Sequence, residues 1–266
     1  MNLSINGELG YELVLAAPYV YYQHLRGERV NLECAKDASC FYPSATTKEV
    51  FQQRTPGLSV LLDGVSLSSF SKPESFHTPK LNTEYWCPPP YSSIYKNDYF
   101  RFDKPLMIVS NKYNIEWDRP PINFIDIDTL DAIFSTFSEK YSIVYNRPLS
   151  TNITNDNSSI LDLQDHAFIK AKHPQVFLMQ DLKNDSLSFN ELQMSLYANA
   201  TNFISTQGGN SVIASYFGGT NIIFAREGGE LDNNSYKNWF PLLSGAKVIQ
   251  VNNYADLVNT TKQEFL

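Results

Sequence analysis

Short apolar runs alternate with segments of helical periodicity through residues 104–254, and this alternation restricts the chain to few folds. The apolar runs are rich in β-branched and aromatic residues, which favours buried strands. Strands that alternate with helices predict a parallel, doubly wound α/β sheet. The expected strands are 104–114, 141–148, 174–182, 201–207, 220–225 and 246–251, and the expected helices are 128–140, 163–173, 188–200 and 210–218.

Two of the expected helices carry specific signals. The helix at 188–200 opens with Ser188 and has Glu191 three residues later, which is the spacing of a capping box. The helix at 128–140 places four apolar side chains on one face. These are Leu130, Ile133, Phe134 and Phe137.

Residues 1–103 are less regular, so we expect two lobes of unequal size. A glycine loop at 6–10 feeds an apolar helix that extends to about residue 25, and the apolar residues lie nearly all round it, as in a buried helix. The proline- and tyrosine-rich stretch at 87–100 is typical of a linker or an extended wrap between lobes. The predicted organisation is a small N-terminal α/β lobe at 1–103, a C-terminal lobe at 104–254 and a tail helix at 255–266.

Composition excludes several classes of protein. The formal net charge of −7 and the scattered cations argue against nucleic acid as a primary partner. No apolar stretch reaches the roughly 18 to 20 residues that cross a bilayer, so no membrane span is expected. Glu8 and Glu12 stand where a signal peptide would be basic. The cysteines, Cys34, Cys40 and Cys87, are therefore expected to be reduced thiols in a cytoplasmic protein.

The segment STQGGNSVIASYFGG, residues 205–219, concentrates four glycines beside an apolar run. Its layout is a strand, a Gly208–Gly209 turn, a polar cap and a helix. In a parallel sheet this is where ligands bind, and the free N–H groups of a helix start suit a phosphate. Asn210 and Ser211 can donate hydrogen bonds to the same anion. A tight turn that holds no ligand explains the local sequence equally well.

Residues 188–225 resemble the donor-binding lobe of GT-B glycosyltransferases. They are similar to the inverting fucosyltransferase and GT61 types, which include xylosyl- and N-acetylglucosaminyltransferases. More narrowly, the whole chain resembles glycosyltransferases of large algal DNA viruses, including a chlorovirus xylosyltransferase type. The sequence has Gln207 where many members have histidine. The resemblance implies a GT-B-like fold with two Rossmann-like lobes and a cleft between them.

The resemblance also implies a catalytic base. An inverting transfer needs a carboxylate that removes the proton of the acceptor hydroxyl. The loop NGELGYEL resembles the Gly-Glu loop of protein O-fucosyltransferases, which assigns this role to Glu8, flanked by Gly7 and Gly10 on the acceptor side. A carboxylate that only stabilises the start of a helix is the alternative interpretation of Glu8. Glu116 or Asp118 would be the base if Glu8 is not.

Donor binding needs cations or N–H donors at the diphosphate. Lys112 and Arg147 follow expected strands, and fucosyltransferase-type enzymes have an arginine at a comparable strand end. Arg147 is therefore the preferred clamp, because its fork can contact two phosphate oxygens. A solvated arginine before a proline is the alternative.

The remaining ligand contacts are assigned more loosely. The family resemblance places the nucleoside near Asp181 and Leu182, and Glu227 or Glu230 could bind the ribose hydroxyls. Trp117 could stack on an acceptor sugar, as could Trp86 and Tyr91, although ordinary packing also explains each aromatic residue.

Metal binding is not expected. Asp126 and Asp128 have the Asp-x-Asp spacing of metal-dependent glycosyltransferases, but an N-cap and an acidic first turn explain them better. The four histidines lack the spacing of a zinc site.

The sequence thus predicts an inverting, metal-independent glycosyltransferase that needs no cofactor. Its co-substrate would be a UDP- or GDP-linked sugar, of the xylose or fucose class, and its acceptor a glycan or glycoprotein. A viral protein of this type would act in the host cytoplasm. The alternative is a non-catalytic nucleotide- or glycan-binding module of the same fold.

Overall fold

The C-terminal part of the chain forms a parallel sheet with the strand order of dinucleotide-binding folds. The computed structural model describes residues 1–55, 58–62, 65–66, 85–115, 118–154, 158–183 and 186–266. The sheet has six strands, all parallel, in the order β10-β8-β6-β11-β12-β13. Numbered along the chain this order is 3-2-1-4-5-6, so the predicted doubly wound sheet is confirmed. The strands are β6 (Leu106–Ser110), β8 (Ser142–Asn146), β10 (Phe177–Leu178), β11 (Asn202–Thr206), β12 (Thr220–Phe224) and β13 (Lys247–Val251).

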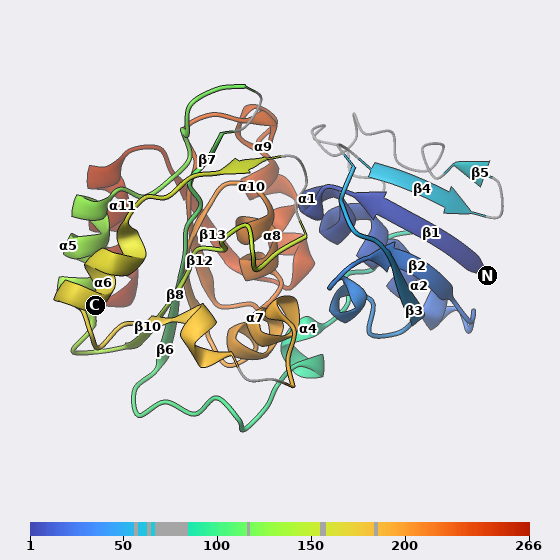
Figure 1. Ribbon diagram of the computed structural model, residues 1–266, viewed down its shortest axis with the longest axis horizontal. Helices are drawn as coiled ribbons and strands as arrows, with labels where there is room; N and C mark the ends of the chain where they lie inside the picture. Colours follow the sequence, from blue (N-terminus) through green and yellow to red (C-terminus); the bar gives the residue numbers. More distant parts are fainter. Residues whose placement is uncertain (56–57, 63–64, 67–84, 116–117, 155–157, 184–185) are drawn as a thin grey trace.

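Helices cover both faces of this sheet (Figure 1). One face carries α5 (Ile127–Phe137), α6 (Asp165–Lys172) and α11 (Tyr254–Phe265). The other face carries α7 (Phe189–Tyr197), α8 (Gly209–Ser215), α9 (Gly229–Asp232), α10 (Ser235–Asn238) and the 3-10 turn η5 (Phe240–Leu243). Strand residues alternate between the two cores, so that Met107 and Val109 face the first and Ile108 faces the second.

The helix signals in the sequence are confirmed. The predicted apolar face of α5, from Leu130 to Phe137, is fully buried. Asp126 is the N-cap of α5 and its carboxylate accepts a hydrogen bond from the Thr129 N–H at 2.9 Å. Ser188 and Glu191 form both hydrogen bonds of a capping box at the start of α7. The strand expected at 174–182 is shorter, because the 3-10 turn η4 (Met179–Leu182) follows β10.

The N-terminal lobe has a second sheet, in the order β3-β2-β1-β4-β5. The strands are β1 (Asn2–Gly7), β2 (Asn31–Ala35), β3 (Thr46–Phe51), β4 (Leu58–Leu62) and β5 (Val65–Ser66). The first three are parallel, whereas β4 pairs antiparallel with β1 and β5 with β4. A helical run follows β1 and consists of α1 (Leu9–Tyr11), the π-helical turn η1 (Glu12–Ala16) and α2 (Ala17–Leu25).

The strands of this lobe were not predicted individually. Their exposure alternates along β1 and β2, and most of β3 is exposed or half-buried. A sheet with one solvated face has polar residues at every second position, which hides short strands in the sequence. A 3-10 turn, η2 (Ser39–Phe41), and the short pair β7 (Asn114–Ile115) and β9 (Ser159–Ile160) complete the irregular parts of the fold.

The segment between the lobes is packed against both of them. Trp86 donates from its indole N–H to the Val14 carbonyl at 2.6 Å. The helix α4 (Tyr91–Ile94) follows, and the Tyr91 hydroxyl donates to the Phe41 carbonyl at 2.6 Å. The Asn97 amide donates to the carbonyl of Ser195 on α7 at 2.8 Å. Trp86 and Tyr91 are therefore packing residues, the alternative that the sequence left open.

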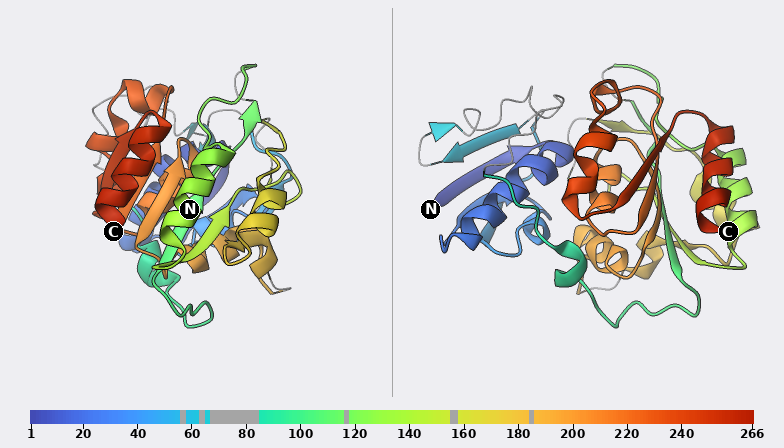
Figure 2. Two further views of the ribbon diagram at one scale, coloured as in Figure 1. Left: turned by 90° about the vertical axis from the view of Figure 1, so that its left-hand side faces the viewer. Right: turned by 180° about the vertical axis from the view of Figure 1, so that it is seen from behind.

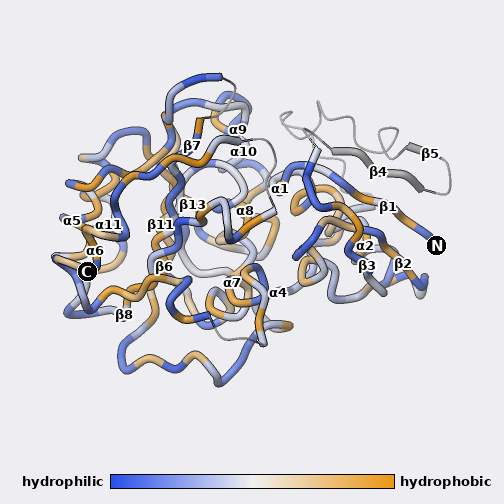
Figure 3. Tube along the Cα trace, in the orientation of Figure 1, coloured by the Kyte–Doolittle hydropathy of each residue, from blue (hydrophilic) through white to orange (hydrophobic). Residues whose placement is uncertain are grey.

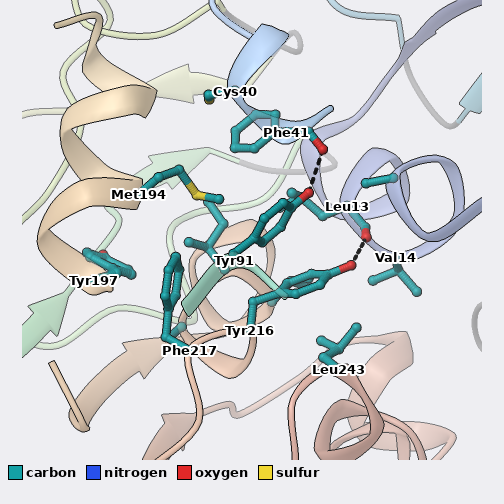
Figure 4. Packing of buried hydrophobic residues seen from close by; sticks show 14 of the residues in the cluster. Leu13, Val14, Cys40, Phe41, Tyr91, Met194, Tyr197, Tyr216, Phe217 and Leu243 are labelled. Carbon is teal, nitrogen blue, oxygen red and sulfur yellow. Dashed lines mark hydrogen bonds between the residues drawn. The ribbon is translucent and has the colours of Figure 1, made fainter. Parts of the chain in front are cut away.

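One apolar core joins the two lobes. Figure 4 shows Leu13 and Val14 of η1 beside Tyr216, whose hydroxyl donates to the Leu13 carbonyl. The Tyr91 and Tyr216 rings are 4.7 Å apart between centroids. Seen from behind, the helical run of the N-terminal lobe lies against the helices around α8 (Figure 2). Along the chain, hydrophobic stretches follow strands and inner helices, and hydrophilic ones follow outer loops (Figure 3).

This shared core predicts that both lobes unfold together. Leu13→Ala removes a fully buried side chain between the lobes, which should lower the free energy of unfolding by about 2–5 kcal/mol. Leu25→Ala, at a side chain that is 58% exposed on the same helical run, should change it by less than about 0.5 kcal/mol. Urea unfolding followed by circular dichroism and by tryptophan fluorescence should give one coincident transition. Two separate transitions in the wild-type protein would contradict the shared core.

Candidate functional site

A pocket of about 310 Å³ lies where the strand order of the six-stranded sheet reverses. In a 3-2-1-4-5-6 sheet the first and fourth strands are neighbours whose following connections lead in opposite directions, which opens a crevice at their carboxyl ends. These strands are β6 and β11; Gln207 follows β11 directly, and Lys112 is the second residue after β6. The pocket has walls from both lobes. Its N-terminal wall consists of Glu8, Leu9, Gly10, Tyr11 and Arg54, and its other lining residues are Lys112, Asn114, Pro148, Ile153, Thr154, Ser158, Ile160, Phe189, Asn190, Gln193, Gln207, Gly208, Gly209, Asn210, Gly229 and Glu230.

Gln207 is held in place by a network that reaches three other segments. Its Oε1 accepts a hydrogen bond from the Asn123 amide at 2.6 Å and lies 3.5 Å from Lys112 Nζ. Its Nε2 donates to Glu230 Oε2 at 2.7 Å. Gln207 is 3% exposed, so both ends of its amide are used for positioning within the pocket wall. The network brings the Lys112 ammonium beside the Gly208 turn.

The glycine pair after Gln207 serves two separate purposes. Gly208 has φ of +102°, a conformation that side chains rarely adopt, and a Cβ there would lie 3.5 Å from Lys112 Nζ. Gly209 has no such constraint, but a Cβ at this position would lie 2.9 Å from Leu9 Cδ2. Gly208 thus permits the turn, and Gly209 permits the close approach of the two lobes at the pocket.

The two polar residues after the glycines have different positions. Asn210 lines the pocket, and its side-chain amide donates to the Asn111 carbonyl at 3.0 Å. Ser211 is fully buried, and its hydroxyl donates back to the Gly208 carbonyl at 2.8 Å. The predicted role of the Ser211 hydroxyl in anion binding is therefore wrong, because that hydroxyl stabilises the first turn of α8.

Glu8 enters the pocket from the N-terminal lobe as the N-cap residue of α1. Gly10 lines the same wall. Gly7 is buried at the end of β1, outside the pocket lining, and its carbonyl accepts a hydrogen bond from Arg54 at 3.0 Å. Arg54 also forms an ion pair with Glu12, which is fully buried in η1. The Arg54 charge is thus matched by Glu12, and its guanidinium fixes the loop that carries Glu8.

Arg147 is not the phosphate clamp that the sequence predicts. Its side chain is 1% exposed and forms a bidentate ion pair with Asp165, with both N–O distances 2.5 Å. Its third nitrogen donates to the Leu161 carbonyl at 3.2 Å. The guanidinium is therefore engaged behind the pocket wall, in a structural role.

The other predicted ligand contacts lie outside this pocket. Asp181 forms an exposed ion pair with Lys170, and Leu182 packs against the apolar core from η4. Glu227 is half exposed and pairs with Arg119 at 2.9 Å. The predicted nucleoside and ribose roles of these three residues therefore do not fit the pocket. Asp118 does not line it either. Glu116 and Trp117 lie outside the described residues.

Several residues of the pocket were not predicted from the sequence. Phe189, Asn190 and Gln193 come from the first turns of α7, and Arg54 comes from an irregular segment. The capping box located the start of α7, but no local signal indicates that its first turns face a ligand. Arg54 follows β3, a strand that the sequence does not reveal.

Neither a cluster of metal-ligating side chains nor a membrane-spanning helix occurs among the described residues. Among them, no group of three or more histidine, cysteine, aspartate or glutamate side chains is arranged to hold a metal ion. Likewise, none of the helices within the described ranges combines the length and apolar character that crossing a membrane requires.

Comparisons with known proteins give weak similarity. No protein-family model and no curated protein matches the chain. Two structures of the wall teichoic acid polymerase TagF are similar to it at 11% and 12% sequence identity, with TM-scores of 0.42 and 0.41. They cover 99% and 92% of this chain and 79% and 75% of the polymerase chains. Similarity at this level does not establish a shared fold or activity.

The Arg147–Asp165 pair predicts a pH-dependent stability. Burial alone would raise the pKa of Asp165, but hydrogen bonds from Arg147 and Tyr145 outweigh it and lower that pKa below its usual value. The pair therefore stabilises the fold above the unfolded-state pKa of about 3.9, and this contribution is lost as pH falls through the lower folded-state pKa.

Asp165→Asn should cost about 3–5 kcal/mol of unfolding free energy at pH 7, because it removes the buried bidentate partner of the guanidinium and leaves it only the exposed Asp162 carboxylate at 3.5 Å. The difference from wild type should shrink below about pH 4. The matched change Asp181→Asn, at an exposed ion pair, should cost less than about 1 kcal/mol. Urea titrations at a series of pH values measure all three proteins, and a pH-independent difference at Asp165 would contradict the ion-pair account.

Proposed function

We propose that the chain is a glycosyltransferase that uses a nucleotide-diphosphate sugar. The single observation that carries this proposal is the pocket at the strand-order reversal, into which one lobe contributes Glu8 and the other Lys112 and the Gly208–Asn210 turn. A carboxylate and a cation that line one pocket suit a transfer in which one group loses a proton and another leaves as an anion.

The diphosphate is assigned to the side of Lys112. The ammonium lies 3.5 Å from where a Gly208 Cβ would be, so the absent side chain leaves room for a phosphate oxygen beside it. The Ser211 N–H already donates to the Gly208 carbonyl at 3.0 Å, so the backbone donors assigned to the phosphate at this turn are the N–H groups of Gly209 and Asn210. As the sugar–phosphate bond breaks, negative charge grows on the leaving phosphate, and a nearby cation stabilises that charge in the transition state.

Glu8 is assigned as the base. It would accept the proton of an acceptor hydroxyl as this hydroxyl attacks the anomeric carbon from the side opposite the diphosphate, which inverts the configuration there. The acceptor, a glycan or glycoprotein, would reach Glu8 from the N-terminal lobe. The reaction needs no metal in this scheme, because the diphosphate charge is met by Lys112 and backbone donors.

Removing the Lys112 charge should weaken nucleotide binding. Lys112→Met should lower the affinity for UDP or GDP by about tenfold or more, because it deletes a charge-assisted contact to phosphate. Lys183→Met, at an exposed lysine directly after η4, is the matched control and should leave the affinity unchanged. Isothermal titration calorimetry checks both. Equal nucleotide affinities in the two variants would show that Lys112 does not contact the nucleotide. A wild-type protein that binds no nucleotide would refute the proposed function.

Removing the Glu8 carboxylate should separate catalysis from binding. Glu8→Gln should slow sugar transfer by about a hundredfold or more, because general-base catalysis contributes on that scale. Donor affinity should stay within about twofold, while Glu33→Gln, at an exposed carboxylate on β2, should leave both properties unchanged.

The transfer assay uses UDP-xylose and GDP-fucose with a panel of glycan acceptors. Full activity in the Glu8 variant would place the base elsewhere. Tight nucleotide binding by the wild-type protein without any transfer or donor hydrolysis would favour a non-catalytic binding module.

A further inference from the structure

Three carboxylates are buried among the described residues, and one of them has no cation beside it. Glu12 forms an ion pair with Arg54. Asp165 forms one with Arg147, and each of these two carboxylates also accepts a hydrogen bond from a tyrosine hydroxyl. The third is Glu230, which is 8% exposed and forms no ion pair within the described part of the chain. A buried charge without a counter-ion destabilises a fold, so Glu230 calls for a different explanation from the other two.

The Glu230 carboxylate has one of its two oxygens open to the pocket. Oε2 accepts a hydrogen bond from Gln207 Nε2 at 2.7 Å. Oε1 accepts none from the described residues, yet it is not one of their polar atoms that are sealed from solvent. Because Glu230 lines the pocket, Oε1 is the oxygen that a ligand can reach. An ionised carboxylate only accepts hydrogen bonds, so the ligand group that suits it is a donor.

The Gln207 amide stands between Glu230 and Lys112. Its Nε2 donates to Glu230, and its Oε1 lies 3.5 Å from Lys112 Nζ. A single amide group thus separates the carboxylate from the ammonium that is assigned to the diphosphate. The part of the ligand next to the diphosphate therefore lies beside Glu230. In a nucleotide sugar this part is either the transferred sugar or the ribose, and both carry hydroxyls.

Tyr11 favours the transferred sugar. Burial raises the pKa of Tyr11 most, followed by Glu8 and then by Glu230. The phenol and the two carboxylates line one pocket, and the phenol is within electrostatic reach of both. Glu8 is the assigned base, which must lie beside the anomeric carbon of the sugar. Glu230 therefore belongs to the same side of the ligand as Glu8.

We propose that Glu230 is a specificity-determining residue that accepts a hydrogen bond from a hydroxyl of the transferred sugar and excludes sugars that carry a carboxylate. This inference rests on the proposed function and adds to it the substrate class, a neutral sugar rather than a uronic acid. A hydroxyl supplies the donor that Oε1 lacks. A sugar carboxylate would instead bring a further negative charge to a wall where Glu230 has no counter-ion, and such like-charge contacts reject ligands.

The test compares two donors that differ at one group. UDP-glucose has a hydroxymethyl where UDP-glucuronic acid has a carboxylate, and GDP-mannose and GDP-mannuronic acid form the corresponding guanine pair. In calorimetry the wild-type protein should bind the neutral donor at least about fivefold more tightly than the acidic one. Glu230→Gln keeps the size of the side chain, and its amide oxygen can still accept from Gln207. It should bring the two affinities within about twofold of each other and change the affinity for UDP or GDP alone by less than about twofold.

Two further variants and one stability measurement serve as controls. Glu227→Gln is the matched control, because Glu227 is in the same loop but is half exposed and pairs with Arg119 outside the pocket, and it should leave the ratio unchanged. Glu230→Asp keeps the charge and should keep the preference for the neutral donor. The melting temperature of free Glu230→Gln protein should not fall, because the change removes a buried charge that has no counter-ion.

Several results would overturn the specificity role and leave the glycosyltransferase proposal standing. These are a wild-type ratio below about fivefold, a ratio that Glu230→Gln leaves unchanged, loss of the preference in Glu230→Asp, and a lower melting temperature of the Glu230→Gln protein. Equal weakening of the neutral donor and of its free nucleotide in Glu230→Gln would also overturn it, because Glu230 would then contact the ribose. No binding of any nucleotide by the wild-type protein would overturn both proposals.

Discussion

The close approach of α1 and η1 to α8 is the contact on which the rest of the structure depends. Leu9 lies where a side chain on Gly209 would be, and the Leu13 carbonyl accepts a hydrogen bond from Tyr216. These contacts join the two sheets through one apolar core, and they also bring Glu8 to the pocket, because Glu8 directly precedes Leu9. The carboxylate of one lobe and the lysine of the other are therefore positioned by the same packing.

Polar residues at the carboxyl ends of the strands set the position of the pocket. Ser110, Asn146 and Gln207 follow or end three neighbouring strands, and all are buried. Ser110 and Asn146 both bond to the Tyr197 hydroxyl, and the Gln207 amide bonds to Asn123 and Glu230. Such a network positions side chains firmly when its hydrogen bonds are satisfied.

The sequence predicted the C-terminal sheet well because its four central strands, β8, β6, β11 and β12, are buried on both faces. Runs such as 106–110 are apolar at consecutive positions, and the glycine pair and the capping box mark the boundaries between strands and helices. The N-terminal strands were harder to recognise, because alternate positions are solvated and Arg54 and Glu12 carry charges into the interior. Local pattern cannot show that a buried ion pair will form between residues 42 positions apart.

The candidate site was only partly predictable for a related reason. Glu8, Lys112 and Gln207–Asn210 follow strands or begin helices, so topology alone brings them together. Arg147 also follows a strand, but its partner Asp165 arrives from α6 and neutralises it, a tertiary event without a local signature. Phe189 and Gln193 line the pocket although the sequence did not predict it. Their helix face has no distinctive pattern, and it becomes a pocket wall only once the N-terminal lobe is in place.

The continuous core also bears on how such a chain can change over generations. In many two-lobed proteins, each lobe can be exchanged or recombined because little is buried between them. Here the interior of one lobe is completed by Val212 and Tyr216 of the other, so a substitution far from the ligand in either lobe shifts the spacing of the groups across the pocket. Either lobe could therefore be exchanged for an unrelated one only if the shared core were rebuilt with it, so each lobe limits which sequences the other can accept.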